Sequence, residues 1–299
     1  VQLGIIDRAT ADRINRNLDP IQAQAWAEGR LYDEFAAALD GQRDRLLRLV
    51  DDTNGRPTQA QLSAFWRAED DAFFANVQRG LYDVAQERAI TSIVTTGAFD
   101  MWETVNQRVI DWVNDYYTNI DAEIVGSIPN LNATGRTEFA RAFIDWQRGE
   151  LETAGYADGL PQLIRAIEPT FGQVRASRIA TTETARIHYE ATYQAAQANE
   201  FITHLRWYTA ADERVCPICG PLHLQTIPKA QRTWAGGVSI PAHVNCRCVA
   251  IEETALTMQT ALPPEERYVW SEDVYRQYQA EQALNRRAPN LIDTLAGRP

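Results

Sequence analysis

Lysine is almost missing from this 299-residue sequence: Lys229 is the only one, and every other basic side chain is arginine. Arginine keeps its charge and makes planar, two-pronged contacts with carboxylates and phosphates. Acidic residues outnumber basic ones, which gives a formal net charge of −11. That charge argues against a protein that coats nucleic acid by bulk attraction, although the 29 basic side chains are enough to form a local patch.

Long apolar runs are also lacking. No stretch approaches the roughly eighteen consecutive apolar residues that a membrane span needs, so none is predicted. The first residues, VQLGIIDRATADRINR, lack a basic region followed by an apolar block, so no secretory signal is predicted either. A hydrophobic fraction of 45% and eight tryptophans predict a folded chain, long enough for one large or two modest domains.

Cysteine is scarce and confined to two segments, VCPICG at 215–220 and PAHVNCRC at 241–248. A C-x-x-C pair followed by a histidine and further cysteines is the pattern of a zinc site, in which two thiolates reach one ion from a tight turn. The candidate ligands are Cys216, Cys219, His243, Cys246 and Cys248. The first four are preferred; Cys248 competes with Cys246 because residues two apart on an extended segment face the same side. His223 is a weaker candidate.

Disulfides and free thiols are the alternatives to a zinc site at these cysteines. Two disulfides would require an oxidising compartment, and unrelated free thiols rarely cluster in this way. A catalytic zinc would need an open coordination position and a glutamate that shuttles protons. The deaminase pattern H-x-E is not supplied by THLRW at 203–207. A nuclease would need a histidine–aspartate or histidine–histidine pair, but His223 is followed by Leu224 and His243 is a candidate zinc ligand. With four or five soft ligands available, we therefore expect a closed, structural ion.

Apolar residues that recur three and four apart predict helices through most of the chain. Asp19-Pro20 supplies a start signal, TNGRPT at 53–58 a turn, and Gly97 a break. The segment GSIPNLNATGRT at 126–137 is expected to be a loop, with Thr134 or Thr137 capping the next helix. The expected helices cover 20–52, 58–96, 101–120, 138–155, 159–169 and about 173–199.

The chain changes character after residue 203, where prolines, glycines and short apolar runs predict small strands and loops. Before that point, Glu183 lies in a mostly apolar row of the last long helix and is expected to form a structural ion pair. The fold class predicted is mainly α, an N-terminal helical region plus a small α+β module stapled by zinc. The expected divisions are 1–158 for the helical region, 159–254 for the module, and 255–299 for a C-terminal helix and extended tail.

The run RIATTETARIHYEATYQAA, with LRWYTAADERVCPICGPLHLQTIP and GGVSIPAHVNCRC after it, resembles the phage Mu F-like head morphogenesis family. The resemblance covers about residues 160–252. It departs from the family pattern at Thr181, where an arginine is usual, and at Ala242, which is inserted before His243. The shared features are Thr182, Glu183, Trp207, Thr209, Asp212, the C-P-x-C knuckle and the closing histidine–asparagine–cysteine–arginine–cysteine segment.

This resemblance implies a non-enzymatic minor head protein of a tailed bacteriophage that enters the procapsid with the portal protein. Its expected partners are the portal, the major capsid or scaffolding protein, and packaged double-stranded DNA. The expected location is the head interior near the portal, and the host cytoplasm during assembly. The alternative is a metal-dependent nuclease or other nucleic-acid-processing zinc protein. The candidate contacts with DNA or a partner are Arg206, Arg214, Arg232 and Arg247.

Overall fold

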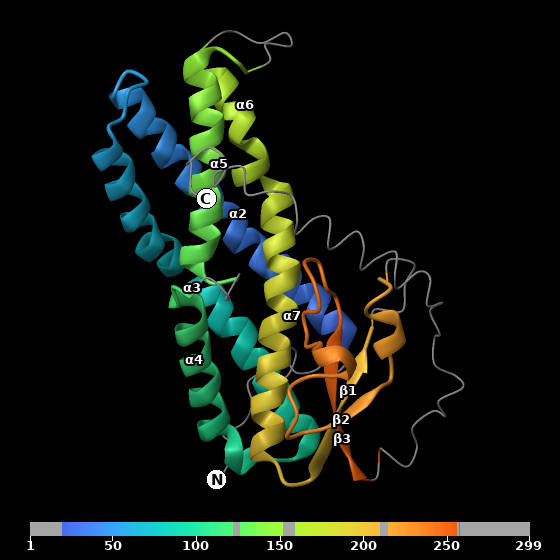
Figure 1. The fold of residues 1–299 in the computed structure, drawn as a ribbon. Helices are drawn as coiled ribbons and strands as arrows, with labels where there is room; N and C mark the ends of the chain where they lie inside the picture. Colours follow the sequence, from blue (N-terminus) through green and yellow to red (C-terminus); the bar gives the residue numbers. More distant parts are fainter. Residues whose placement is uncertain (1–19, 122–125, 152–158, 210–214, 256, 258–299) are drawn as a thin grey trace.

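The computed structural model describes residues 20–121, 126–151, 159–209, 215–255 and 257. Long helices lie beside one another, and a small sheet packs against the C-terminal half of one of them, α7 (Figure 1). None of the described helices is both long and apolar enough to cross a membrane. The longer elements are α2 (Pro20–Asp52), α3 (Gln59–Thr96), α4 (Trp102–Thr118), α5 (Ile128–Arg148), α6 (Leu160–Phe171), α7 (Gln173–Ala198), β1 (Ile202–Tyr208), β2 (Thr226–Pro228) and β3 (Val249–Thr254).

Helix α3 shows how closely local signals set the boundaries. Thr58 accepts the N–H of Gln61 and the side chain of Gln61 returns to the Thr58 N–H, which is a capping box. At the other end Gly97 adopts the left-handed conformation, with φ 72°, that a helix C-cap favours. The helix predicted over 58–96 is therefore confirmed.

The loop predicted over 126–137 is wrong, because α5 already begins at Ile128, after the N-cap Ser127. Pro129 lies in the first turn, where the missing N–H costs no helical hydrogen bond. The polar residues that suggested a loop have tertiary partners instead. Asn132 is buried, accepts from Gln42 at 2.8 Å and donates to Asp70 at 2.8 Å.

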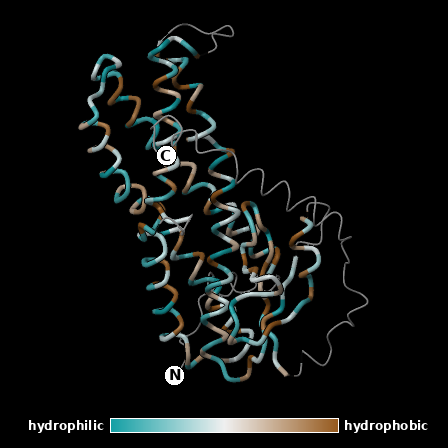
Figure 2. Tube along the Cα trace, viewed as in Figure 1, coloured by the Kyte–Doolittle hydropathy of each residue, from teal (hydrophilic) through white to brown (hydrophobic). Residues whose placement is uncertain are grey.

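Two hydrophobic cores share helix α7. Its residues Ile179, Ile187 and Ala191 pack in the larger core, which α2 to α6 complete. Ala185 and Tyr189 face a smaller core formed with the sheet and the cysteine loops. Apolar and polar residues alternate along the helices in Figure 2, as expected for helices that each bury one face.

The sheet is antiparallel, in the order β2-β1-β3. Leu205 and Trp207 of β1 are fully buried in the smaller core. The Trp207 ring meets the Trp234 ring edge-on, with centroids 5.0 Å apart. The described residues are mainly α-helical with one small three-stranded sheet, which confirms the predicted fold class. The division at residue 158 stays a prediction, and the C-terminal helix and tail fall outside the described residues apart from 255 and 257.

Candidate metal centre

The pairing of β1 with β3 brings the two cysteine segments together. Tyr208, the last residue of β1, pairs with Val249, the first residue of β3. The strands are antiparallel, so the chain that follows β1 and the chain that precedes β3 emerge at the same end of the sheet. The first carries the knuckle of Cys216 and Cys219, and the second carries His243, Cys246 and Cys248.

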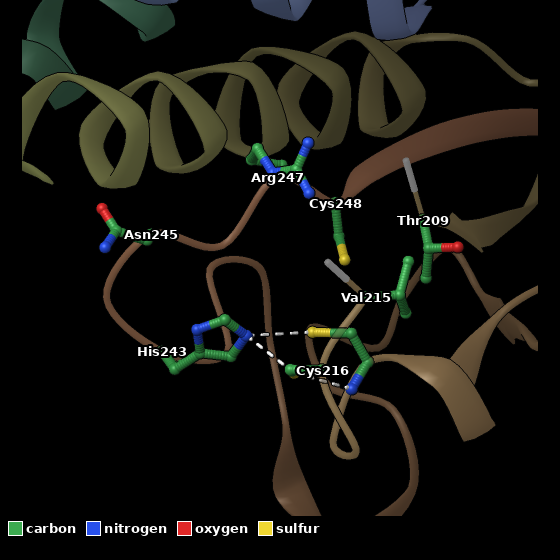
Figure 3. Close-up of a pocket in the computed structure, with 8 residues that line it drawn as sticks. Thr209, Val215, Cys216, His243, Asn245, Arg247 and Cys248 are labelled. Atoms are coloured by element: carbon green, nitrogen blue, oxygen red, sulfur yellow. Dashed lines mark hydrogen bonds between the residues drawn. The ribbon is translucent and has the colours of Figure 1, made fainter. Parts of the chain in front are cut away.

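All five predicted ligands meet in this cluster. The Nε2 atom of His243 lies 2.9 Å from Cys216 Sγ and 3.3 Å from Cys219 Sγ, as the dashed lines in Figure 3 mark. Cys219 Sγ is 3.9 Å from Cys246 Sγ. The donor atoms fall into two groups that share Cys219, with all atoms in each group within 4.8 Å of one another: Cys216, Cys219 and His243, and then Cys219, Cys246 and Cys248. The cluster can bind a metal ion.

Tight turns hold the ligands in place. The backbone N–H of Cys219 donates to Cys216 Sγ at 3.3 Å, which closes the first turn around the thiol. In the second, the N–H of Cys246 donates to the His243 carbonyl at 3.2 Å. Asn245 stands between them with φ 63°, a left-handed conformation that asparagine tolerates better than most residues.

Hydrogen bonds among the four thiols shift their pKa values in opposite directions. A hydrogen bond with Cys219 lowers the pKa of Cys216 to about 5 against the opposing effect of burial. Hydrogen bonds with Cys219 and Cys248 hold the pKa of Cys246 well below its usual range, whereas those with Cys216 and Cys246 raise the pKa of Cys219. Burial disfavours the His243 cation, but its contact with Cys216 and the charge of Cys246 raise its pKa to about 9. A divalent cation would supply the positive charge that additional thiolates need.

The cavity at the cluster is small, with a volume of about 20 Å³. Figure 3 shows Cys216, His243 and Cys248 around it. That volume suits one water-sized sphere and no organic substrate. Thr209, Val215, Asn245 and Arg247 complete its lining together with Cys219.

Residues 156–251 match the family model described as Phage Mu protein F like protein. This segment is a phage Mu F-like module. The match confirms the resemblance drawn over about 160–252 and takes in the whole cysteine–histidine cluster. Comparison of the chain with curated proteins and with solved structures finds no match. The match indicates a phage head morphogenesis protein.

The arginines predicted to contact DNA or a partner occupy different settings in the Mu F-like module. Arg206 lies 2.9 Å from a Glu253 carboxylate oxygen, and Arg232 makes a two-pronged pair with Glu190 at 2.8 and 3.2 Å. Arg247 lines the small cavity, and Arg214 falls outside the described residues, as does Asp212.

His223, the weaker ligand candidate, is not among the donors of either described group. Its Nδ1 atom accepts the backbone N–H of Thr209 at 3.2 Å, and its ring lies against Tyr208 with centroids 4.9 Å apart. Burial lowers its pKa, which favours the neutral ring. His223 therefore supports the strand end beside the cluster.

The threonine–glutamate pair of α7 has contacts on two sides of the helix. Thr182 Oγ1 accepts a hydrogen bond from the backbone N–H of Asn245 at 3.0 Å. This bond ties α7 to the loop that carries His243 and Cys246. Glu183 forms the predicted ion pair, with Arg186 at 3.1 Å, and also accepts from the Tyr117 hydroxyl at 3.0 Å. The contact with Asn245 was not predicted. The asparagine could have signalled a left-handed turn at this position, but not the helix residue that the turn contacts.

Proposed function

We propose that this chain is a minor head protein of a tailed bacteriophage, located inside the head near the portal. There it assists procapsid assembly, DNA packaging or genome ejection. The observation that carries the proposal is the match of residues 156–251 to the phage Mu protein F-like family. Its partners are then the portal protein and the major capsid or scaffolding protein, which it meets in the host cytoplasm during assembly.

We further propose that the cluster holds one Zn²⁺ through Cys216, Cys219, His243 and Cys246. Thiolates and imidazole are the ligands that zinc prefers, and four of them complete a tetrahedron. Cys216 lies 2.9 Å from His243 and Cys219 lies 3.9 Å from Cys246. Cys219 belongs to both donor groups and so links the four proposed ligands. Cys248 is then an extra thiol beside the site.

A structural role for the ion is supported by the setting of the cluster. Cys219, Cys246 and Cys248 are buried, and the cavity of about 20 Å³ leaves no room for a substrate. When bound, zinc would contribute folding free energy to a loop-rich region whose strands are short. A nuclease would need another group to activate water near the ion, and His223 contacts Thr209 instead.

The helical region over 1–158 is proposed to dock on the portal or capsid. The net charge of −11 makes the whole molecule a poor general DNA binder. We propose contact with packaged DNA only at a local group of arginines: Arg206, Arg214, Arg232 and Arg247. At Arg206 and Arg232, DNA would compete with the carboxylates of Glu253 and Glu190.

Co-expression of the full-length chain with the portal and capsid proteins of the same phage tests the proposal. We expect the chain to co-purify with the portal and to be present in purified heads by mass spectrometry. A plasmid-nicking assay with Mg²⁺ or Mn²⁺ is run on the same material, and no cleavage is expected. Absence from heads, combined with cleavage that His223→Ala abolishes, would establish the nuclease instead.

A further inference from the structure

We infer that Thr182 is a positioning residue for the metal ion: its hydroxyl holds the loop that carries His243 and Cys246. This inference rests on the proposed metal site. The threonine itself is no ligand, since its Oγ1 contacts the backbone of Asn245, which stands between the two ligands in sequence.

The hydroxyl of Thr182 is oriented by its own helix. It donates to the carbonyl of Arg178, one turn earlier, at 2.7 Å. With its hydrogen committed, the oxygen is left to accept, and the N–H of Asn245 donates to it at 3.0 Å. Thr182 is also buried, with 8% of its surface exposed, so water has little access to the acceptor side of the bond.

This bond lies at the turn of the loop that carries His243 and Cys246. Asn245 is the left-handed residue of the turn, and the N–H of the next residue, Cys246, closes the turn onto His243 at 3.2 Å. Fixing the N–H of Asn245 therefore fixes the direction in which both ligands leave the turn. Outer contacts of this kind orient metal ligands in advance of binding.

Glu183, the next residue, ties the same turn of α7 to the helical region. Successive helix residues point about 100° apart, so neighbours reach different surfaces. Glu183 accepts from Tyr117 of α4 at 3.0 Å and pairs with Arg186 at 3.1 Å, and it is 3% exposed. The loop is thus positioned relative to the helical core through two adjacent side chains and does not depend on the ion alone.

The substitution Thr182→Val removes the hydroxyl at nearly constant shape. The loop must then be ordered at the moment of metal binding, so we expect zinc affinity to fall about ten-fold. Thr182→Ser restores the hydroxyl and the affinity. Thr184→Val is the matched control, because Thr184 is fully buried on the same helix and its hydroxyl has no partner among the described residues.

The experiment measures Zn²⁺ affinity of the full-length variants by competition with a chelator, and records the absorption of their Co²⁺ forms. Unchanged Co²⁺ spectra with weaker zinc binding only in Thr182→Val are expected. Equal affinities of Thr182→Val and wild type would refute the positioning role and leave the zinc site intact. No metal binding by the wild type would refute the site itself, and the positioning role with it.

Hydrogen exchange of the zinc-loaded wild type provides a measurement that requires no variant. The Asn245 amide lies on an exposed residue, yet its bond to Thr182 predicts slow exchange. Exchange as fast as that of an unbonded exposed amide would contradict the inference even if Thr182→Val failed to fold.

Discussion

Arg88 of α3 and Glu252 of β3 form a buried ion pair, with Nη2 and Oε2 3.2 Å apart and side chains only 6% and 8% exposed. Arg88 also donates to Thr192 of α7 at 2.8 Å, and Ser92 bonds the second carboxylate oxygen of Glu252. The pair therefore joins the helical region to the outer strand of the sheet. It is a polar link between the two hydrophobic cores.

Removing one partner of this ion pair should lower the stability of the fold. Arg88→Met leaves Glu252 buried without its cation, so we expect the free energy of unfolding to fall by about 3–5 kcal/mol, measured by urea denaturation. The double variant with Glu252→Met should recover much of that loss because no charge stays buried. As a control, Arg79→Met removes a pair with Asp83 whose arginine is 88% exposed, and a change of at most about 1 kcal/mol is expected. Similar small losses at both sites would contradict the role of the pair.

His188 predicts a pH dependence of stability. Burial, reinforced by the charge of Arg88, lowers its pKa from 6.5 to about 3. Below pH 6.5 His188 binds a proton in the unfolded chain but not in the folded one. The free energy of unfolding therefore decreases as the pH falls from 6.5 toward 3. At saturating metal, wild type should lose about 2 kcal/mol more than His188→Gln between pH 7 and pH 5. Parallel pH profiles would show that His188 stays protonatable in the fold.

Gly126 is required by a close approach. A Cβ atom added there would lie 2.6 Å from the Tyr116 hydroxyl oxygen and would also collide with the Glu183 carboxylate. Gly126→Ala should lower the free energy of unfolding by about 1–3 kcal/mol. The same change at Gly29, within α2 and with open space around it, should raise stability by about 0.5–1 kcal/mol. Thermal unfolding compares the two, and a neutral Gly126→Ala would disprove the crowding.

Serine substitutions distinguish the ligands. Cys219 belongs to both donor groups, so Cys219→Ser should abolish tight zinc binding and unfold the region around the sheet. If Cys248 is the extra thiol, Cys248→Ser should keep one zinc per chain with an unchanged Co²⁺ spectrum. Retention of zinc by Cys246→Ser and its loss from Cys248→Ser would reverse the assignment. Chelator titration followed by circular dichroism measures both effects.

Sequence patterns predicted the helices because their causes are local. The capping box of Thr58 and Gln61 and the left-handed Gly97 lie next to the boundaries that they set. The start of α5 was misplaced since its polar residues looked like a loop. Only the fold reveals that Asn132 has Gln42 and Asp70 as partners, 90 and 62 residues away in the chain.

That the five candidate ligands lie together could be predicted from the sequence, because thiol and imidazole chemistry restricts the residues that serve as zinc ligands. The contacts around the cluster could not. The bond from Asn245 to Thr182 joins residues 63 apart, and no spacing rule links a helix threonine to a loop amide. In the same way, the sequence identifies Arg206 and Arg232 as candidate contacts with DNA or a partner. Only the fold shows that Glu253 and Glu190 pair with them.

Zinc content is the most direct test of the central claim that one structural ion holds the two cysteine segments together. Elemental mass spectrometry of full-length protein, purified without chelators, is combined with alkylation of the native cysteines. The account predicts one zinc per chain, with Cys216 and Cys219 protected until the metal is removed. Protein that contains no zinc, and whose Cys216 and Cys219 react freely in the native fold, would contradict it.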